Sequence, residues 1–368
     1  MNKMNLKVIS IAVSIVILLT FACSKKSPTE SETIQDKIHN ASEISESVSN
    51  KYEVFIASNP ESQARRLLVN ELESYSAVQN AGISADSTTV WWKLKNGLNC
   101  AFLTETILSL AKNQSNAVEL PKFKKQHLEK KLLVNKNALM LSPFQWQMTS
   151  SDATTSIKNL FHDADFHVEY LSNEDDDEAN FSLADYKDFD DYGAVYILTH
   201  GHLDGDNNIM LNAGIEINKI SDNDMDEFAE GLNEDYFDYT TIKGIEGKRY
   251  LAFSPKWIKS LYSQSLQSTL IYANACVSLF NSTMANAMIG TSDPTSIYFG
   301  WTNKPTKNDG NETAQYFFNE LLNAGLDCGD AWENLRDNNL GISRPFKNPV
   351  SYLEYKGNSE LQLINVVE

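Results

Sequence analysis

AVYILTHG at residues 194–201 and TLIYANAC at residues 269–276 are the stretches that decide the fold. Each begins as a continuous run of apolar residues, with β-branched and aromatic members, and neither run alternates with polar positions. Continuous runs of this length are typical of strands in a parallel sheet that is covered on both faces. The first run ends in His200 and Gly201 and the second in Cys276, so we expect reactive side chains at the carboxyl ends of two buried strands.

The rest of residues 135–368 alternates between strand and helix patterns. Further strands are predicted at residues 137–142, 167–171 and 296–301, and helices are predicted to begin at Ser151, Ser182 and Pro255 and to cover residues 313–322. Such alternation predicts an α/β domain with a mainly parallel sheet and helices on both sides. Residues 203–252 interrupt the pattern, because they are acidic and punctuated by glycine. We expect them to form a subdomain or loop near the strand ends.

The residues before 135 divide into three parts. Residues 24–48 are polar and rich in Ser and Glu, which is typical of a tether. A small N-terminal α+β region is expected next, with a helix at about residues 60–78 and a β-hairpin over residues 88–103. The predicted organisation is therefore set out by residue range as follows: a signal peptide over 1–22, a lipidated cysteine and tether over 23–49, the small region over 50–134 and the α/β domain over 135–368.

The first 22 residues combine a basic start, at Lys3 and Lys7, with an apolar run of about 15 residues, shorter than the roughly 20 of a membrane-spanning helix. This is the pattern of a secretory signal peptide. Cys23 follows directly, and the segment resembles the lipobox of bacterial lipoproteins, with Thr20 where leucine is usual. The resemblance implies that Cys23 is acylated and that the chain is anchored to the cell envelope, with Ser24 favouring the outer membrane. A plain secretory signal or an uncleaved anchor is the alternative.

Charge and cysteine content narrow the partners of the chain. It has 31 Lys and Arg and 49 Asp and Glu, so removal of Lys3 and Lys7 with the leader leaves 29 − 49 = −20. So acidic a chain is not expected to bind nucleic acid or to adsorb electrostatically to anionic lipid. If Cys23 carries lipid, three cysteines remain, and at least one thiol is unpaired. A disulfide between Cys100 and Cys328 is one arrangement; both are otherwise expected to be packed core residues.

His200 and Cys276 are 76 residues apart (276 − 200), but the carboxyl ends of parallel strands meet in one crevice. A thiolate nucleophile with an imidazole to move the proton is the equipment of cysteine catalysis, and backbone N–H groups can bind the oxyanion. We expect Cys276 as nucleophile, His200 as general acid and base, and the N–H groups of Gly201 and Cys276 as oxyanion donors. His202 is the alternative to His200.

An apolar block followed by His-Gly, then a second block followed by Ala-Cys, resembles the caspase-like cysteine peptidases of clan CD, such as caspases, gingipains, clostripain, legumain and separase. The closing SYLEYKGNSELQL at residues 351–363 is similar to the final strands of the bacterial gingipain-like and clostripain-like domains. The resemblance covers roughly residues 135–368. It implies a three-layer caspase-like domain, with Cys276 as nucleophile, His200 as general acid and base, and Gly201 as an oxyanion donor.

The sequence departs from these families around the substrate. Clostripain-like members have an acidic residue two positions before the nucleophile that helps to bind a basic side chain, and this chain has Asn274 there. It also has no counterpart of the arginines with which caspases accept aspartate. Asn274 stays a candidate substrate-binding residue, but the residue preferred before the scissile bond (the P1 residue) does not transfer from the resemblance.

No cofactor is expected. Some clostripain relatives use calcium, and the acidic loop at residues 204–208 offers oxygen ligands. However, Gly214 and Ile215 stand where an EF-hand loop would place its glutamate, so an EF-hand is excluded and a solvated acidic loop is favoured. The sequence also lacks a phosphate loop, a Cys-x-x-Cys zinc motif and a dinucleotide fingerprint. We therefore expect neither a bound metal nor a nucleotide cofactor.

These patterns predict a membrane-anchored cysteine endopeptidase (a hydrolase) that cleaves protein or peptide substrates through an acyl-enzyme. The alternative is a non-catalytic module with a caspase-like fold that binds a partner at the cell surface. Selective labelling of Cys276 by a peptide ketone discriminates between the two.

Overall fold

The computed structural model of the chain describes residues 33–104, 131–148, 151–262, 264–292, 294–344 and 349–364. The predicted signal peptide and Cys23 lie outside these ranges, so what the sequence predicts for them stays a prediction. Within the described ranges, no helix is both long enough and apolar enough to cross a lipid bilayer.

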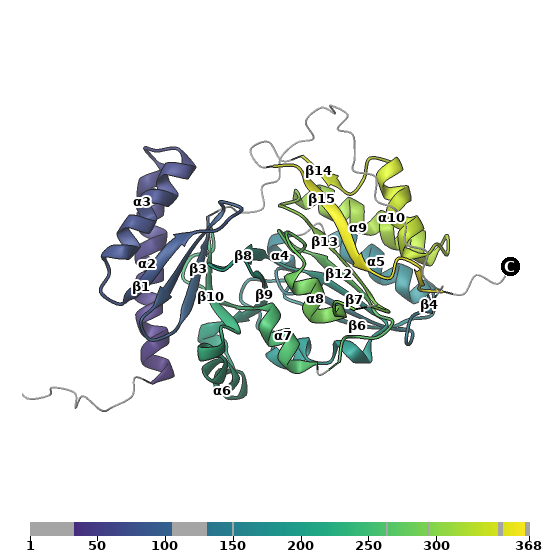
Figure 1. Cartoon of the computed structure of the whole chain (residues 1–368), viewed down its shortest axis with the longest axis horizontal. Coiled ribbons are helices and arrows are strands. Elements are labelled where there is room, and N and C mark those ends of the chain that lie inside the picture. The colour runs from purple at the N-terminus through teal and green to yellow at the C-terminus, as the bar shows by residue number, and fades with distance from the viewer. Residues whose placement is uncertain are drawn as a thin grey trace, which may run out of the picture.

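A seven-stranded sheet, which we call the central sheet, forms the middle of the larger part of the molecule (Figure 1). Its strand order is β14-β15-β13-β12-β7-β5-β6. The five strands from β13 to β6 run parallel, and β15 and β14 are antiparallel to their neighbours. The strands are β5 (Asn137–Ser142), β6 (His167–Ser172), β7 (Ala194–Leu198), β12 (Leu270–Asn274), β13 (Ile297–Trp301), β14 (Ile342–Ser343) and β15 (Ser351–Gly357). The five strands predicted from continuous apolar runs are thus confirmed, and they are neighbours in one sheet.

Helices cover both faces of the central sheet, because successive residues of a strand point to opposite sides. On one face Met140, Tyr196 and Tyr272 pack with α5, α9 and α10; on the other Leu139 and Ile197 pack with α7 and α8. The α/β class with helices on both sides is therefore confirmed (Figure 1). The helices are α2 (Ile34–Ile56), α3 (Glu61–Ser74), α4 (Gln145–Met148), α5 (Ser151–Asp163), α6 (Asp222–Gly231), α7 (Pro255–Leu261), α8 (Thr283–Ile289), α9 (Lys307–Leu322) and α10 (Cys328–Asp337).

Shorter elements complete the chain. The helix predicted from Ser182 forms as two separate 3-10 turns, η1 (Leu183–Tyr186) and η2 (Phe189–Asp191). Two further 3-10 turns, η3 (Ile217–Lys219) and η4 (Leu232–Glu234), flank α6. A two-stranded parallel ladder joins β4 (Lys131–Leu132) to β16 (Leu361–Gln362).

A second seven-stranded sheet, the lateral sheet, joins the N-terminal hairpin to the segment that interrupts the α/β pattern. Its order is β1-β2-β3-β10-β11-β9-β8, and β3 pairs in parallel with β10. The strands are β1 (Val78–Ile83), β2 (Thr89–Leu94), β3 (Asn99–Leu103), β8 (Gly201–Leu203), β9 (Ile209–Glu216), β10 (Phe237–Ile242) and β11 (Tyr250–Phe253). The hairpin is confirmed. Residues 203–252, predicted as a subdomain or loop, supply four strands that extend its sheet, which leaves no bare edge on β3.

The prediction of a polar tether over residues 23–49 is wrong from Ile34 onward, where α2 begins. The side chains of Ile38, Ile44, Val48 and Tyr52 are buried on one face of this helix. That face packs against α3 and β3, and Figure 1 places both helices over the N-terminal hairpin. The abundance of Ser and Glu hides the stripe in the sequence, because the apolar residues are few but fall on one side.

Candidate active site at the ends of two strands

The two sequence motifs lie at the same edge of the central sheet. β7 and β12 are neighbouring parallel strands, with Leu198 paired to Asn274 at their last residues. Beyond that pair the Thr199 N–H still donates to the Asn274 carbonyl, at 3.3 Å. The residues that follow, His200 on one strand and Cys276 on the other, therefore leave the sheet side by side.

Gly201 lies directly against the backbone of Cys276. A Cβ atom built on Gly201 would be 2.1 Å from the Cys276 carbonyl oxygen, so no residue with a side chain fits. The Asn212 N–H donates to the His200 carbonyl at 2.9 Å, which makes Gly201 and Leu211 a non-hydrogen-bonded pair of the antiparallel β8–β9 ladder. The Gly201 N–H is therefore directed away from β9, to the open edge of the lateral sheet.

His200 sits where the chain passes from the central sheet to the lateral sheet, and its ring is 97% shielded from solvent. Its Nε2 is 2.6 Å from Oε1 of Gln147, and the edge of its ring meets Phe144 at 4.8 Å between centroids. An amide oxygen only accepts hydrogen bonds, so this contact assigns the proton to Nε2 and leaves a lone pair on Nδ1. Burial, with the positive charge of Lys304 and with His202, lowers the pKa of His200 to about 3. The imidazole is therefore neutral at neutral pH.

Cys276 occupies a tight turn with a strained neighbour. Its side chain is only 8% exposed, and it is a thiol rather than half of a disulfide. Val277 has φ of +52°, which is an outlier for a β-branched residue and costs about 1–3 kcal/mol. The hydroxyl of Ser278 fixes the turn by donating to the carbonyls of Ala273 and Ala275, at 2.9 and 2.8 Å. The fold thus holds this cysteine in a conformation that the local sequence does not favour.

Asn274 anchors the end of β12. Its side chain is 5% exposed; its Nδ2 donates to the Tyr196 hydroxyl at 3.2 Å and its Oδ1 accepts from the Trp301 indole at 3.1 Å. These contacts give it a structural role that the sequence did not predict. It also lines a narrow pocket beside Cys276, which keeps it a candidate substrate contact.

The pocket beside Cys276, which we call the thiol pocket, lies between the ends of β7 and β12 and the beginning of α9. Met148, Leu198 and Gly310 supply apolar walls, and Lys307 stands in its lining. A Cβ on Gly310 would be 2.8 Å from Oδ1 of Asn274, so the pocket is bounded closely on that side.

His202, the alternative general base, is in the interior of the lateral sheet. It is fully buried, its Nε2 is 3.1 Å from Oδ2 of Asp238, and its Nδ1 has no hydrogen-bond partner among the described residues. It is absent from the lining of the thiol pocket. The geometry therefore favours His200 over His202.

The acidic loop after His202 is folded on itself. Asp204 accepts hydrogen bonds from the N–H groups of Asp206 and Asn208, at 2.9 and 2.7 Å. Burial, with the negative charge of Asp238, raises the pKa of Asp204 to about 6. Among the described residues, no group of three or more His, Cys, Asp and Glu side chains is arranged to hold a metal ion.

Cys100 and Cys328 are fully buried core residues, as predicted. Burial raises the pKa of both thiols, with smaller contributions from Asp238 and Asp327 respectively. Neither belongs to a disulfide, so the pairing considered from the sequence does not form. A buried thiol of raised pKa is a poor nucleophile, which leaves Cys276 as the reactive candidate.

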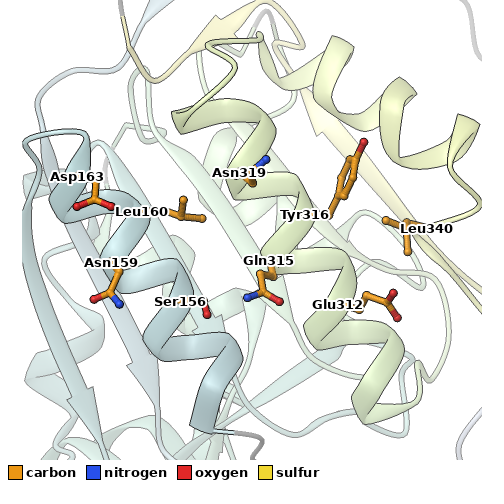
Figure 2. Close-up of a pocket in the computed structure, with 9 residues that line it drawn as sticks. All are labelled: Ser156, Asn159, Leu160, Asp163, Glu312, Gln315, Tyr316, Asn319 and Leu340. Carbon is orange, nitrogen blue, oxygen red and sulfur yellow. The ribbon is translucent and has the colours of Figure 1, made fainter.

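A wider groove between α5 and α9 shares no lining residue with the thiol pocket (Figure 2). Ser156 of α5 and Gln315 of α9 face each other across it, and Asp163 and Glu312 lie nearer its ends. Its lining contains neither cysteine nor histidine. This groove offers no nucleophile and is not the candidate active site.

Sequence reasoning missed three residues of the site: Gln147, Val277 and Lys307. Gln147 follows β5, and the carboxyl end of that strand meets the same edge as β7, so its strand position was an available signal. Lys307 was detectable as the first residue of a helix that follows β13. The positive φ of Val277 has no signal in the sequence, because valine is the residue least expected there.

Comparison with known proteins adds no family to this geometry, because no protein-family model and no curated protein matches the chain.

Proposed function

We propose that this protein is a cysteine endopeptidase with a caspase-like catalytic domain, in which Cys276 is the nucleophile and His200 the general acid and base. One observation carries the proposal: β7 and β12 are adjacent and parallel, and Gly201 packs against the Cys276 backbone too closely for any Cβ. Two motifs far apart in the chain thereby meet at the edge of the sheet where α/β proteins bind ligands.

The reaction begins with the neutral imidazole. Nδ1 of His200 accepts the thiol proton, and the thiolate attacks the carbonyl carbon of the scissile bond. The resulting oxyanion is stabilised by the backbone N–H groups of Gly201 and Cys276. The imidazolium then gives its proton to the departing amine as the C–N bond breaks, which leaves a thioester on Cys276.

Water completes the cycle. It attacks the thioester carbonyl while His200 takes one of its protons, and the thiolate leaves and recovers that proton from the imidazolium. Gln147 acts on this cycle through His200: by accepting from Nε2–H it holds the ring orientation and the tautomer that leaves Nδ1 unprotonated. Gln147 is in this sense a positioning residue.

Covalent labelling tests the proposal. The chain from residue 24 is treated with a peptidyl acyloxymethyl ketone and the modified residue is located by peptide mass spectrometry, first without and then with calcium. Modification of Cys276, with Cys100 and Cys328 untouched, is the expected result, and Cys276→Ala should remove it. Absence of labelling under both conditions, with the chain still folded by circular dichroism, would contradict the proposal.

A non-catalytic surface module is the second candidate, and one observation favours it. The exposed fractions of His200 and Cys276 are only 3% and 8%, and the pocket between them and α9 is narrow. A protein that binds a partner elsewhere has no need of an open site. An unlabelled Cys276 in a folded chain would support this candidate.

We also propose that the protein is lipid-anchored through Cys23 at the cell envelope, at the outer membrane. The basic start, the short apolar run and the cysteine that follows it support this proposal. Metabolic labelling with an alkyne fatty acid in a bacterial host should mark the wild-type chain and leave Cys23→Ser unmarked. Equal labelling of both proteins, or of neither, would contradict it.

A further inference from the structure

The thiol pocket carries one charge. Among the described residues that line it, Lys307 is the only ionisable side chain other than Cys276 itself, and none is a carboxylate. The remaining lining is apolar or neutral, including Asn274 and Asn311 at its inner side. A pocket of this composition has no group with which to neutralise a basic side chain.

Lys307 has no acidic partner in the fold. Within the described part of the chain, none of its hydrogen bonds or ion pairs involves the Lys307 ammonium. Burial lowers the pKa of this ammonium, because its charged form is partly desolvated without compensation. An anionic group in the pocket would supply the missing partner.

The charges around the pocket have the same sign. Lys307 is the first residue of the 16-residue α9, whose N-terminus carries partial positive charge. Lys304 is buried nearby and lowers the pKa of His200 through its charge. The nearest acid in α9, Asp309, is turned toward Ser343, whose hydroxyl donates to it at 2.6 Å, and it does not line the pocket.

We propose that the thiol pocket receives the P1 side chain and that this side chain is acidic, with its carboxylate bound by Lys307. The inference rests on the proposed peptidase function. The narrow walls, bounded by Gly310 and Asn274, admit a short side chain, so aspartate fits the pocket. Lysine at P1 would place two ammonium groups together with no carboxylate to separate them.

The test compares three peptidyl acyloxymethyl ketones that differ only in the P1 residue: aspartate, its neutral isostere asparagine, and lysine. The second-order rate of Cys276 modification is measured for each. We expect the aspartate reagent to react about tenfold faster than the asparagine reagent, the ratio that one charge-assisted hydrogen bond supplies. The lysine reagent should be the slowest.

Lys307→Gln should reduce the aspartate-to-asparagine ratio to about one, because the ammonium is removed and the volume is nearly kept. Lys259→Gln removes the same charge from an exposed position of α7 and should keep the wild-type ratio. Both rates are measured on one preparation, so the ratio does not depend on the fraction of active molecules.

The outcomes separate this inference from the function on which it rests. Modification of Cys276 by the asparagine or lysine reagent at least as fast as by the aspartate reagent would overturn the acidic preference and leave the peptidase standing. A ratio unchanged in Lys307→Gln would overturn the assignment to Lys307. No modification by any of the three reagents would overturn the peptidase proposal and this inference with it.

Discussion

His200 and His202 are two residues apart, yet they belong to regions with different physical character. His200 lies at the edge of the central sheet, held by a neutral amide and facing the motif that ends β12. His202 lies within the lateral sheet, bonded to the carboxylate of Asp238 and fully buried. One histidine is placed where a substrate can be reached, and the other where it joins two parts of a sheet.

The same contrast separates the cysteines. Cys276 follows a strand of the central sheet in a strained turn and lines a pocket, whereas Cys100 lies inside β3 of the lateral sheet. A reactive group needs both access and a partner that can move its proton, and only the edge of the central sheet combines them. The two regions therefore divide the work: one carries the proposed chemistry and the other holds the chain that returns from it.

Cysteine replacement is expected to separate the regions most strongly. Cys276→Ala should lower kcat/KM for a peptide substrate by at least about a thousandfold, because the nucleophile is removed. Cys328→Ala, in the core, should keep the activity per folded molecule. Steady-state assays normalised to folded protein check both. Comparable losses in the two variants would mean that the edge of the central sheet is not special.

Gly201→Ala tests the close approach between the two motifs. The new Cβ would meet the Cys276 carbonyl oxygen at 2.1 Å, so the free energy of unfolding should fall by about 3 kcal/mol. Gly247→Ala is the control: its φ is +73° but no atom lies within 4 Å of the added Cβ, so the loss should be about 1 kcal/mol. Urea denaturation measures both. A Gly201 variant as stable as the control would argue against the contact.

Acidification should expose the buried state of His200. Its pKa is about 3 in the folded chain and about 6.5 when unfolded, so the unfolded state takes up a proton first as the pH falls. The stability that the neutral imidazole preserves above pH 6.5 is thus lost progressively toward pH 3, by about 2 kcal/mol between pH 7 and 5.

His200→Gln cannot take up that proton and should lose less stability over the same range. The raised pKa values of Asp204 and Glu354, about 6 and 7, make stability fall as the pH rises through the acid range, but they act equally in both proteins. Denaturation curves at the two pH values give the difference. Identical losses in wild type and variant would show that His200 is not shielded in this way.

Gln147→Ala is expected to have the smallest effect, a fall in kcat of about tenfold with KM little changed, since one hydrogen bond to His200 is lost. Gln147→Glu adds a readout that a purely structural role would not move. A carboxylate beside the ring stabilises the imidazolium, so the acid limb of the pH–rate profile should move to higher pH. An unshifted profile would remove Gln147 from the proposed mechanism.

The central sheet could be predicted from the sequence because its strands are continuous apolar runs separated by helical patterns. Strand ends follow from the same runs, so His200 and Cys276 could be placed at one edge before any coordinates. The lateral sheet could not be predicted, since β3 and β10 pair across more than a hundred residues and neither strand carries a mark of its partner.

The details of the site were less accessible for the same reason. Gln147 reaches His200 from the end of another strand, and Lys307 enters the pocket from the start of α9; both contacts depend on packing rather than on local pattern. The helix α2 was missed because four apolar residues among many serines and glutamates make a weak signal, although their spacing on one face is regular.

Cleavage of a proteome-derived peptide library tests the proposed dyad most directly. New peptide termini, identified by mass spectrometry, should appear with the wild-type chain and be missing with Cys276→Ala and with His200→Gln, while both variants remain folded. The residues before those new termini should be predominantly acidic. Termini that persist in Cys276→Ala, or a wild-type chain that generates none, would contradict catalysis at the paired ends of β7 and β12.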